Sequence, residues 1–333
     1  MPDSLAQSLK TPHAETAAAS VCVIIPTFRR PQGLEQAMRS VVAQAGVSAL
    51  SLPLSLPISL IVCDNSPEAS ARAQVEGFEA AFPVIYIHEP KTGVANARNS
   101  AVKACDADFI AFLDDDEEAP AGWLARLMAV QARFDADVVF GPVEARLADS
   151  ATRYSGYFTR FFSRFGPESS QVLNSYYGCG NSLIRRSALP KDHAPFSIER
   201  NDMGGEDDQL FHGLMTGGAT LAWAADAPVF EDVPAARSRL GYTLLRAFAY
   251  GQGPSYTAAH DGKPFTAAAW MCQGVAQGLI FGLWGLALWL LRRDGCAEKL
   301  DKAARGCGKL IWFSPFKVGF YGAALLKPKP RGR

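Results

Sequence analysis

The sequence has few of the residue patterns that build metal clusters or disulfide frameworks. Its seven cysteines contain no C-x-x-C pair, and its five histidines form no H-x-H or H-E-x-x-H motif. An odd number of cysteines, several of them inside apolar runs, predicts a reducing compartment and no disulfide framework. The scattered histidines argue against a zinc site. The pattern of a signal peptide is also missing, and we expect residues 1–20 to form a disordered leader.

The chain has no net charge, with 33 basic and 33 acidic side chains among its 333 residues. This balance hides an asymmetry. Beyond Leu291, eleven Lys and Arg stand against three Asp and Glu, a balance of +8, which leaves 22 basic and 30 acidic side chains, or −8, in the first 291 residues. A basic segment after an apolar run indicates an anionic membrane surface rather than nucleic acid as a partner.

Apolar residues make up 48% of the chain, which is enough for one large α/β domain with an appendage. Four short apolar runs alternate with helical patterns, and the links between them are short. This alternation predicts a mostly parallel sheet with helices on both faces. The predicted strands are 21–28, in which we expect Pro26 to end the strand, 58–63, 84–88 and 109–113.

The segments around these strands are less regular. We expect a helix from Pro67 to about Phe82, a loop insertion at 46–57 and a further strand at 138–143. Residues 150–175 are rich in aromatic residues and arginine without clear periodicity, and are interpreted as a mobile loop. Residues 179–186 favour an edge or antiparallel strand.

An acidic cluster, Asp114-Asp115-Asp116 with Glu117-Glu118 behind it, follows the fourth predicted strand. Open α/β sheets bind ligands at the carboxyl ends of their strands. Because side chains alternate along a strand, Asp114 and Asp116 should point the same way, which suits a hard divalent cation that keeps water and phosphate oxygens as its other ligands. The alternative is a solvated acidic turn that caps the following helix.

Residues 266–291 carry no charge over 26 positions, which is long enough to span a bilayer. Gly274, Gly278 and Gly282 repeat at the spacing of close helix contacts in lipid. A second apolar stretch lies at 310–326, and the segments around it are basic. Because basic segments stay in the cytoplasm, this pattern favours a re-entrant or interfacial hairpin over a single span. The alternative is a buried helix of a soluble protein.

Five segments together resemble family 2 glycosyltransferases with the GT-A fold. They lie in the family's order and at its separations across about residues 20–235: VCVIIPTFRR, IVCDNS, GVANARNSA, FIAFLDDDE and GGEDDQLF. EDVPAARSR and the following AFAYGQG look similar to bacterial exopolysaccharide transferases of the succinoglycan type, whereas the insertion at 46–57 is a departure. The resemblance implies a GT-A domain at 21–255. The apolar runs and the charge pattern predict a membrane-associated helical hairpin or span at 264–327 and a basic tail at 328–333.

The resemblance implies a nucleotide-sugar donor, usually a UDP-sugar. Pro26 and Thr27 would line the nucleotide pocket, and Asp64 would accept a hydrogen bond from the nucleobase. The alternative for Asp64 is a simple Asx turn. Arg98 would reach the nucleotide or its diphosphate, because guanidinium geometry suits phosphate oxygens, or would form a surface salt bridge.

The acidic cluster would complete this donor site. Asp114 would contact the ribose or metal-bound water, with Asp115 in the same substrate site, and Asp116 with Asp114 would hold Mn²⁺ or Mg²⁺. A cation there stabilises the charge that develops on the departing nucleoside diphosphate. Which of the three aspartates binds the cation directly stays open.

The resemblance also implies an inverting transfer by a single displacement. Asp207 would be the base that removes the proton from the acceptor hydroxyl, with Glu206 beside it as a second catalytic carboxylate. Glu206 or Asp208 could instead hold the acceptor. Adjacent carboxylates raise one another's pKa, which suits a base. The alternative is that these acids only cap a helix.

Two weaker assignments concern the end of the domain. Arg237 or Arg239 would cover the diphosphate as part of a closing loop, or would simply start a helix. Some relatives have a metal-binding histidine in this part of the domain, where this sequence has Glu231 and Asp232.

The sequence therefore predicts a membrane-associated inverting hexosyltransferase at the cytoplasmic face of a bacterial inner membrane. Its acceptor would be a lipid-linked saccharide of cell-surface or exopolysaccharide synthesis, and it would bind no nucleic acid. One alternative is a synthase that transfers the sugar to polyprenyl phosphate itself, and another is a non-catalytic assembly protein that binds nucleotide sugar. A soluble nucleotidyltransferase is disfavoured, because Pro26-Thr27-Phe28-Arg29 stands where a Gly-rich, Lys-bearing loop would be needed.

Overall fold

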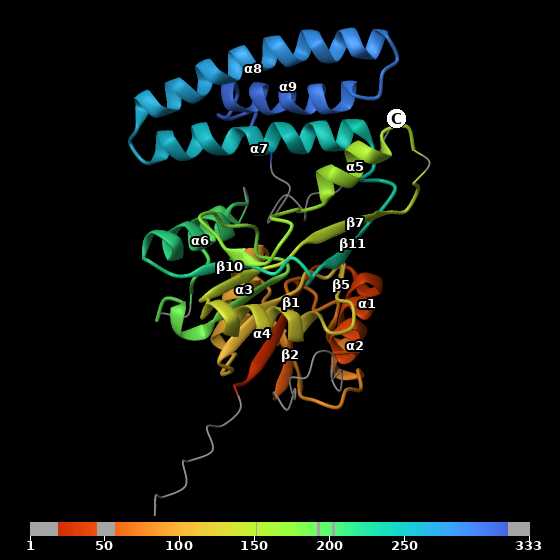
Figure 1. Ribbon diagram of the computed structural model, residues 1–333, viewed down its shortest axis with the longest axis vertical. Coiled ribbons are helices and arrows are strands. Elements are labelled where there is room, and N and C mark those ends of the chain that lie inside the picture. Colours follow the sequence, from red (N-terminus) through yellow and green to blue (C-terminus); the bar gives the residue numbers. More distant parts are fainter. Residues whose placement is uncertain (1–18, 45–56, 151, 192–193, 202–203, 319–333) are drawn as a thin grey trace, which may run out of the picture.

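The computed structural model describes residues 19–44, 57–150, 152–191, 194–201 and 204–318. The predicted leader at 1–20, the insertion at 46–57 and the basic tail at 328–333 lie wholly or largely outside these residues, as does the second apolar stretch beyond residue 318. A sheet covered by helices forms the body of the molecule, and three long helices lie side by side above it in Figure 1.

Eight strands form the main sheet. Their spatial order is β3 (Val84–His88), β2 (Ile58–Asp64), β1 (Val21–Thr27), β4 (Phe109–Phe112), β9 (Ser182–Arg185), β6 (Val138–Phe140), β10 (Leu221–Trp223) and β8 (Gln171–Val172). β9 runs antiparallel to β4 and β6, and β8 antiparallel to β10, whereas the other pairings are parallel. Six strands thus share one direction, which confirms the mostly parallel sheet.

Both faces of the sheet are buried, as the side chains of β1 illustrate. Val21, Val23 and Ile25 share a core with α1 (Pro31–Val42), α2 (Arg72–Glu76) and α4 (Trp123–Phe134). Cys22 and Ile24 point the other way and share a core with α3 (Val94–Lys103) and α6 (Glu206–Thr216). A strand that is buried on both faces has to be apolar throughout, which explains the continuous run in the sequence.

One strand prediction needs correction, and one of the two alternatives for residues 179–186 is confirmed. The predicted strand at 138–143 is divided at Gly141-Pro142 between β6 and β7 (Val143–Leu147), because proline offers no N–H to continue a ladder. β7 belongs to a second sheet, in the order β5 (Glu117–Glu118), β11 (Val229–Val233), β7. β9 is antiparallel, but it lies between β4 and β6 and is no edge strand.

Two predicted element ends are also wrong. β1 does not end at Pro26 but continues to Thr27. Its pairing with β4 stops at Ile24, and a proline without an N–H is tolerated where the strand is paired on one side only. The helix expected to reach Phe82 is only the short α2, which ends before Gly77, a poor helix former.

The segment 150–175 contains a helix, α5 (Ser155–Phe162), which corrects its interpretation as a loop. Three of its aromatic side chains, Tyr157, Phe158 and Phe162, are buried together with Val233 of β11 and Ala297 of α9 (Cys296–Leu310). α5 therefore connects the second sheet to the C-terminal helices.

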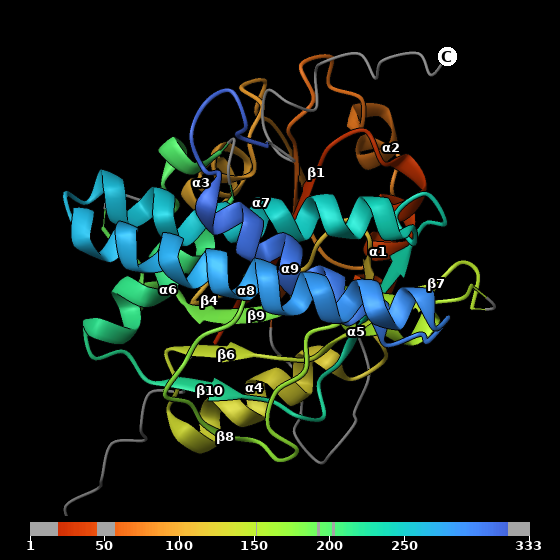
Figure 2. The ribbon, with the colours of Figure 1, turned by 90° about the horizontal axis from the view of Figure 1, so that it is seen from above.

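Three helices form a layer that lies across the sheet, as Figure 2 shows from above: α7 (Leu240–His260), α8 (Pro264–Leu290) and α9. Glycines let their backbones approach closely. A Cβ atom added at Gly306 of α9 would lie 2.7 Å from the amide nitrogen of Gly278 and 2.8 Å from the carbonyl oxygen of Gly274. The spaced glycines of α8 thus face α9. α7 continues through residue 255, the expected end of the catalytic domain.

We predict that Gly306→Ala lowers the free energy of unfolding by about 1–3 kcal/mol, because the new methyl group meets backbone atoms that cannot move away easily. Gly213→Ala is the matched control in α6, where nothing lies within 4 Å of an added Cβ. It should raise stability by up to about 1 kcal/mol, since glycine is unfavourable inside a helix. Chemical denaturation of the full chain in one detergent compares the two, and equal effects would contradict the close α8–α9 contact.

Candidate active site

The predicted site residues lie at one edge of the sheet, where neighbouring parallel strands end. Thr27 ends β1, Asp64 ends β2 as its register partner, and Asp114 follows β4 by two residues. This is the edge at which open α/β sheets bind ligands. The first turn of α6 brings Glu206 and Asp207 to the same region.

Asp115 is buried and holds the end of β1 in place. Its carboxylate accepts hydrogen bonds from the Thr27 hydroxyl (2.8 Å) and the Phe28 amide (3.3 Å), and forms an ion pair with Arg30 (2.8 Å). Burial raises the pKa of Asp115 to about 6, although Arg30 opposes this shift. Thr27 and Asp115, both assigned to the substrate site, therefore contact each other.

Asp116 lies between two arginines. Its Oδ2 is 2.6 Å from Nη1 of Arg30 and 3.2 Å from Nη1 of Arg237. Arg237 also lies 3.7 Å from Glu231, a side chain whose pKa burial and the nearby Asp116 raise to about 7. Arg237 was predicted to cover the diphosphate, and the structure places it on this aspartate. The sequence gives no sign of the role of Arg30, because no local pattern links it to a carboxylate 86 positions away.

Arg98 is buried and joins the two acidic segments. Its guanidinium donates to Glu206 Oε1 at 2.7 Å and lies 3.4 Å from Asp114 Oδ1. Burial raises the pKa of Glu206, and Arg98 opposes that shift. The side chain of Arg98 is only 6% exposed. The alternative of a surface salt bridge is therefore wrong.

Asp207 is partly buried at the start of α6. Gly204 and Gly205 precede it with φ values of +79° and +84°, a conformation that favours glycine and turns the chain into the helix. Asp207 accepts hydrogen bonds from the Cys179 amide (3.1 Å) and from the Asp208 amide in the first turn. It is therefore a first-turn acid of α6 and also contacts the segment before β9.

A strap of residues 178–180 lies between Asp207 and the acidic cluster. A Cβ at Gly178 would lie 3.3 Å from Asp207 Oδ2, and one at Gly180 would lie 2.7 Å from Asp114 Oδ2 and 2.8 Å from Glu117 Oε1. The strap can pass so close to both groups only because it has glycine at these positions. The two carboxylate groups thus share one site.

Arg164 and Glu117, which the sequence did not single out, complete the site. Arg164 donates to the carbonyl oxygens of Gly178 (3.0 Å) and Gly180 and so fixes the strap. Glu117 accepts a hydrogen bond from the Asp114 amide (2.9 Å), and burial raises its pKa well above the usual range. Arg164 follows α5. The helical spacing of the aromatic residues in α5 is the signal in the sequence that this segment is ordered.

Asp64 is fully buried and is engaged within its own turn. Its carboxylate accepts hydrogen bonds from the amide and hydroxyl of Ser66 (2.9 and 2.7 Å) and from the Ala71 amide (2.7 Å). These are the contacts of the Asx turn that the sequence left as the alternative. Contact with a nucleobase stays a prediction. Pro26, the remaining predicted pocket residue, is partly exposed at the end of β1.

The described residues contain no cluster of three or more His, Cys, Asp or Glu that could hold a metal ion. Asp114 and Asp116 are two partly exposed carboxylates, with side chains 37% and 19% exposed. They fit a hard cation that takes one or two carboxylates and completes its shell with water and phosphate oxygens, and they do not form a cage of protein ligands.

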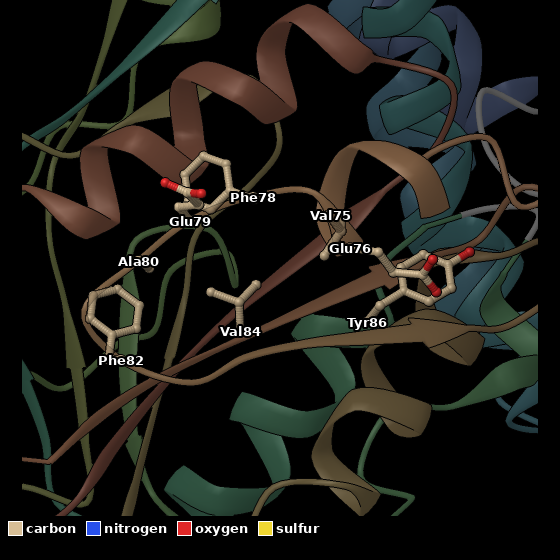
Figure 3. Close-up of a pocket in the computed structure, with 8 residues that line it drawn as sticks. All are labelled: Val75, Glu76, Phe78, Glu79, Ala80, Phe82, Val84 and Tyr86. Carbon is tan, nitrogen blue, oxygen red and sulfur yellow. The ribbon is translucent and has the colours of Figure 1, made fainter.

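The pocket in Figure 3 lies elsewhere, beside α2 and β3. Val75, Phe78, Phe82, Val84 and Tyr86 contribute to its lining, together with Glu76, Glu79 and Ala80. None of the predicted site residues lines it. The candidate site is therefore defined by its side-chain chemistry and not by this pocket.

Comparison with known proteins decides the family. Residues 22–191, just over half of the chain, match the family described as Glycosyl transferase family 2. The chain belongs to this family. This match confirms the resemblance that the sequence motifs predict. It also confirms that the chain is a family 2 glycosyltransferase. The match includes the Asp114–Asp116 cluster and ends before Glu206 and Asp207.

Relatives of this glycosyltransferase occur in bacteria and archaea. It is 36% identical over 230 residues to the succinoglycan biosynthesis protein ExoM of Rhizobium meliloti (strain 1021), covering 68% of this chain and 71% of the relative. It is 23% identical over 273 residues to glycosyltransferase AglE of Haloferax volcanii, covering 81% and 80%. The fold is similar to that of S. aureus TarS 1-349 in complex with UDP-GlcNAc, with a TM-score of 0.51 at 14% identity over 87% of this chain and 90% of that chain. The GT-A fold is thus confirmed.

We predict that Glu231→Gln makes the stability of the glycosyltransferase less dependent on pH between about 4.5 and 7. The folded protein keeps a proton on Glu231 up to about pH 7, whereas the unfolded chain releases it near 4.5. Its contribution to stability is therefore present at low pH and is lost as pH rises through this window, by up to about 3 kcal/mol.

Urea unfolding of wild type and Glu231→Gln at several pH values measures this difference. Glu144→Gln, which changes an exposed glutamate on β7, is the control and should follow the wild-type curve. A Glu231→Gln curve parallel to that of the wild type would show that this carboxyl is ionised in the folded protein.

Proposed function

We propose that this glycosyltransferase moves a hexose from a UDP-sugar to a lipid-linked saccharide with inversion at the anomeric carbon. The observation that carries the proposal is the arrangement of two carboxylate groups about the 178–180 strap, Asp114 on one side and Asp207 on the other. The UDP-GlcNAc complex of S. aureus TarS supports the donor class, and the name of the R. meliloti relative supports a role in exopolysaccharide synthesis.

Asp116, with Asp114 beside it, is the proposed holder of Mn²⁺ or Mg²⁺. Such a cation would stabilise the charge of the departing diphosphate. Arg30 and Arg237, which lie within 3.2 Å of Asp116, are positioned to pair with phosphate oxygens when the donor enters. Pro26, Asp64 and Arg98 remain the proposed nucleotide side of the site, with Arg98 acting through its pairs with Asp114 and Glu206.

Asp207 is the proposed base. As the acceptor oxygen forms its bond to the anomeric carbon, the bond from that carbon to the diphosphate oxygen breaks, the acceptor proton passes to Asp207, and UDP leaves. Glu206 is buried and ion-paired with Arg98, so it is better suited to hold that arginine than to take a proton. No covalent intermediate with the protein is needed.

The acceptor would be held at the cytoplasmic face of the inner membrane. α8 is the one helix among the described residues that is long and apolar enough to cross a membrane, and only 11% of its most apolar window is buried inside the protein. A membrane-bound enzyme can reach a saccharide on a polyprenyl diphosphate that cannot leave the bilayer. Transfer to polyprenyl phosphate itself is the alternative that an acceptor assay would distinguish.

We predict that Asp207→Asn keeps UDP-sugar binding and lowers transfer by about 10²–10⁴-fold, because the amide cannot take the acceptor proton. Release of UDP in the presence of membrane extract measures turnover, and calorimetry measures binding. Asp106→Asn, the same change at an exposed turn after α3, should leave both unchanged. Normal turnover by Asp207→Asn would remove it as the base, and wild type that binds donor without releasing UDP would favour a binding protein.

We further predict that Asp116→Ala abolishes the Mn²⁺-dependent part of nucleotide-sugar binding, because the proposed carboxylate ligand is lost. A screen of UDP-sugars by calorimetry, with Mn²⁺ and with a chelator, gives the measurement and also identifies the donor. Asp106→Ala serves as the control. Equal Mn²⁺ dependence in wild type and Asp116→Ala would move the cation to other residues.

A further inference from the structure

The outer face of α8 is an exposed apolar stripe. Val275, Leu279, Leu283, Leu286 and Leu290 recur at helical spacing, and each side chain is between 43% and 69% exposed. The opposite side of the helix is occupied, since Ala267, Gly274 and Gly285 are buried. Large continuous apolar surfaces of this kind mark sites of contact with a membrane or another protein.

The packing of α8 against α9 is incompatible with crossing a bilayer. Gly274, Gly278 and Gly285 of α8 contact Gly306, Cys307 and Leu300 of α9, so the two helices lie alongside each other over much of their length. If α8 crossed the hydrocarbon core, these contacts would draw α9 in with it. α9 carries six charged side chains: Glu298, Lys299, Asp301, Lys302, Arg305 and Lys309. Placing them in hydrocarbon would be very costly.

The acidic side chains and the lysines of α9 lie on different sides of the helix. Its acidic residues face the catalytic body: Glu298 pairs with Arg160 of α5, and Asp301 accepts a hydrogen bond from Tyr157 (3.0 Å). Its lysines lie along the aromatic residues of α8. Lys299 Nζ is 4.0 Å from the ring centre of Trp284, Lys302 is 5.1 Å from Phe281, and Lys309 is 5.0 Å from Trp270.

We propose that α8 lies in the plane of an anionic phospholipid surface, with Lys299 and Lys302 at the level of the headgroups. α8 is the outermost helix in Figure 1 and α9 lies beneath it, between α8 and α7, so an immersed α8 places the axis of α9 about one helix separation, roughly 8–10 Å, closer to water. Interfacial helices bury their apolar face to about 5–10 Å, with basic residues and tryptophans at the headgroup level.

This placement also relates the bilayer to the base of the proposed reaction. Gly204, three residues before Asp207, lines a small cavity together with Gln252 and Tyr256 of α7 and Trp312 and Lys317 beyond α9. The helical layer that carries the apolar stripe therefore borders the same cavity as the segment that leads into α6. The inference deepens the proposed function by naming the surface at which the enzyme works. The relevance of this surface to a lipid-linked acceptor rests on the proposed function, whereas the contact of α8 with the membrane does not.

Sedimentation with vesicles tests the charge requirement. The full chain should bind vesicles of phosphatidylcholine with phosphatidylglycerol more tightly than vesicles of phosphatidylcholine alone. The double variant Lys299→Gln/Lys302→Gln should bind the anionic vesicles roughly 25-fold more weakly, at about fivefold for each lysine. Lys103→Gln/Arg133→Gln, which removes two exposed charges from α3 and α4, is the matched control and should bind like wild type.

Depth measurement tests the orientation. Single fluorescent labels at positions 275, 283 and 290, in a chain whose exposed Cys272 and Cys307 are replaced by serine, report depth through quencher-bearing lipids. A helix in the plane gives equal depths at the three sites. A spanning helix would separate the first and last labels by about 22 Å, at 1.5 Å for each of 15 residues, and that result would overturn the proposal.

Two further outcomes count against it. Equal binding of wild type and Lys299→Gln/Lys302→Gln would remove the headgroup contact, and a dimer in the absence of vesicles that does not bind them would assign the stripe to a second copy. UDP-sugar binding in detergent is measured separately. A chain that binds vesicles as proposed but no UDP-sugar would refute the proposed function alone, whereas one that binds UDP-sugar but shows no anionic preference would refute only this inference.

Discussion

The site depends on the neutralisation of a dense group of carboxylates by guanidinium groups. Asp115 and Glu206 are almost completely buried, and each is ion-paired with an arginine, Arg30 or Arg98. Taking such charges out of water is costly, and removing one partner of a buried pair typically costs about 3–5 kcal/mol. The arginines therefore allow the chain to concentrate negative charge where a phosphate-bound cation is expected, and they are themselves suited to phosphate oxygens.

Backbone geometry brings the acidic groups from distant parts of the sequence to this place. The parallel order of β2, β1 and β4 places Asp64, Thr27 and the Asp114–Asp116 cluster at one edge. The antiparallel β9 begins beside the end of β4, so the 178–180 strap that precedes it lies at that edge, where glycines allow it to pass between Asp114 and Asp207. A side chain at Gly180 would displace one of the carboxylates, so the strap is as important for the site as the acids.

Local patterns in the sequence were sufficient for the sheet and the acidic cluster, but not for contacts between distant residues. A buried strand followed by aspartates can be recognised from the local sequence, as residues 109–116 show. The central place of β9, the ion pairs of Arg30 and the hydrogen bonds of Arg164 depend on neighbours far along the chain, which periodicity does not reveal. The helix α5 has a local signal, because Tyr154, Tyr157, Phe158 and Phe161 repeat at helical spacing, but the aromatic and arginine-rich composition of 150–175 obscures it.

The C-terminal helices show why length and hydropathy do not decide between a span and an interfacial helix. α8 satisfies both criteria for crossing a bilayer. The glycine face of α8, however, packs against a charged helix, α9. The acidic side of α9 is in turn fixed to α5 and hence to the second sheet. A segment linked in this way to a folded, charged body cannot leave the plane of that body without breaking these contacts. The orientation of α8 is therefore a property of the whole domain and not of its own 27 residues.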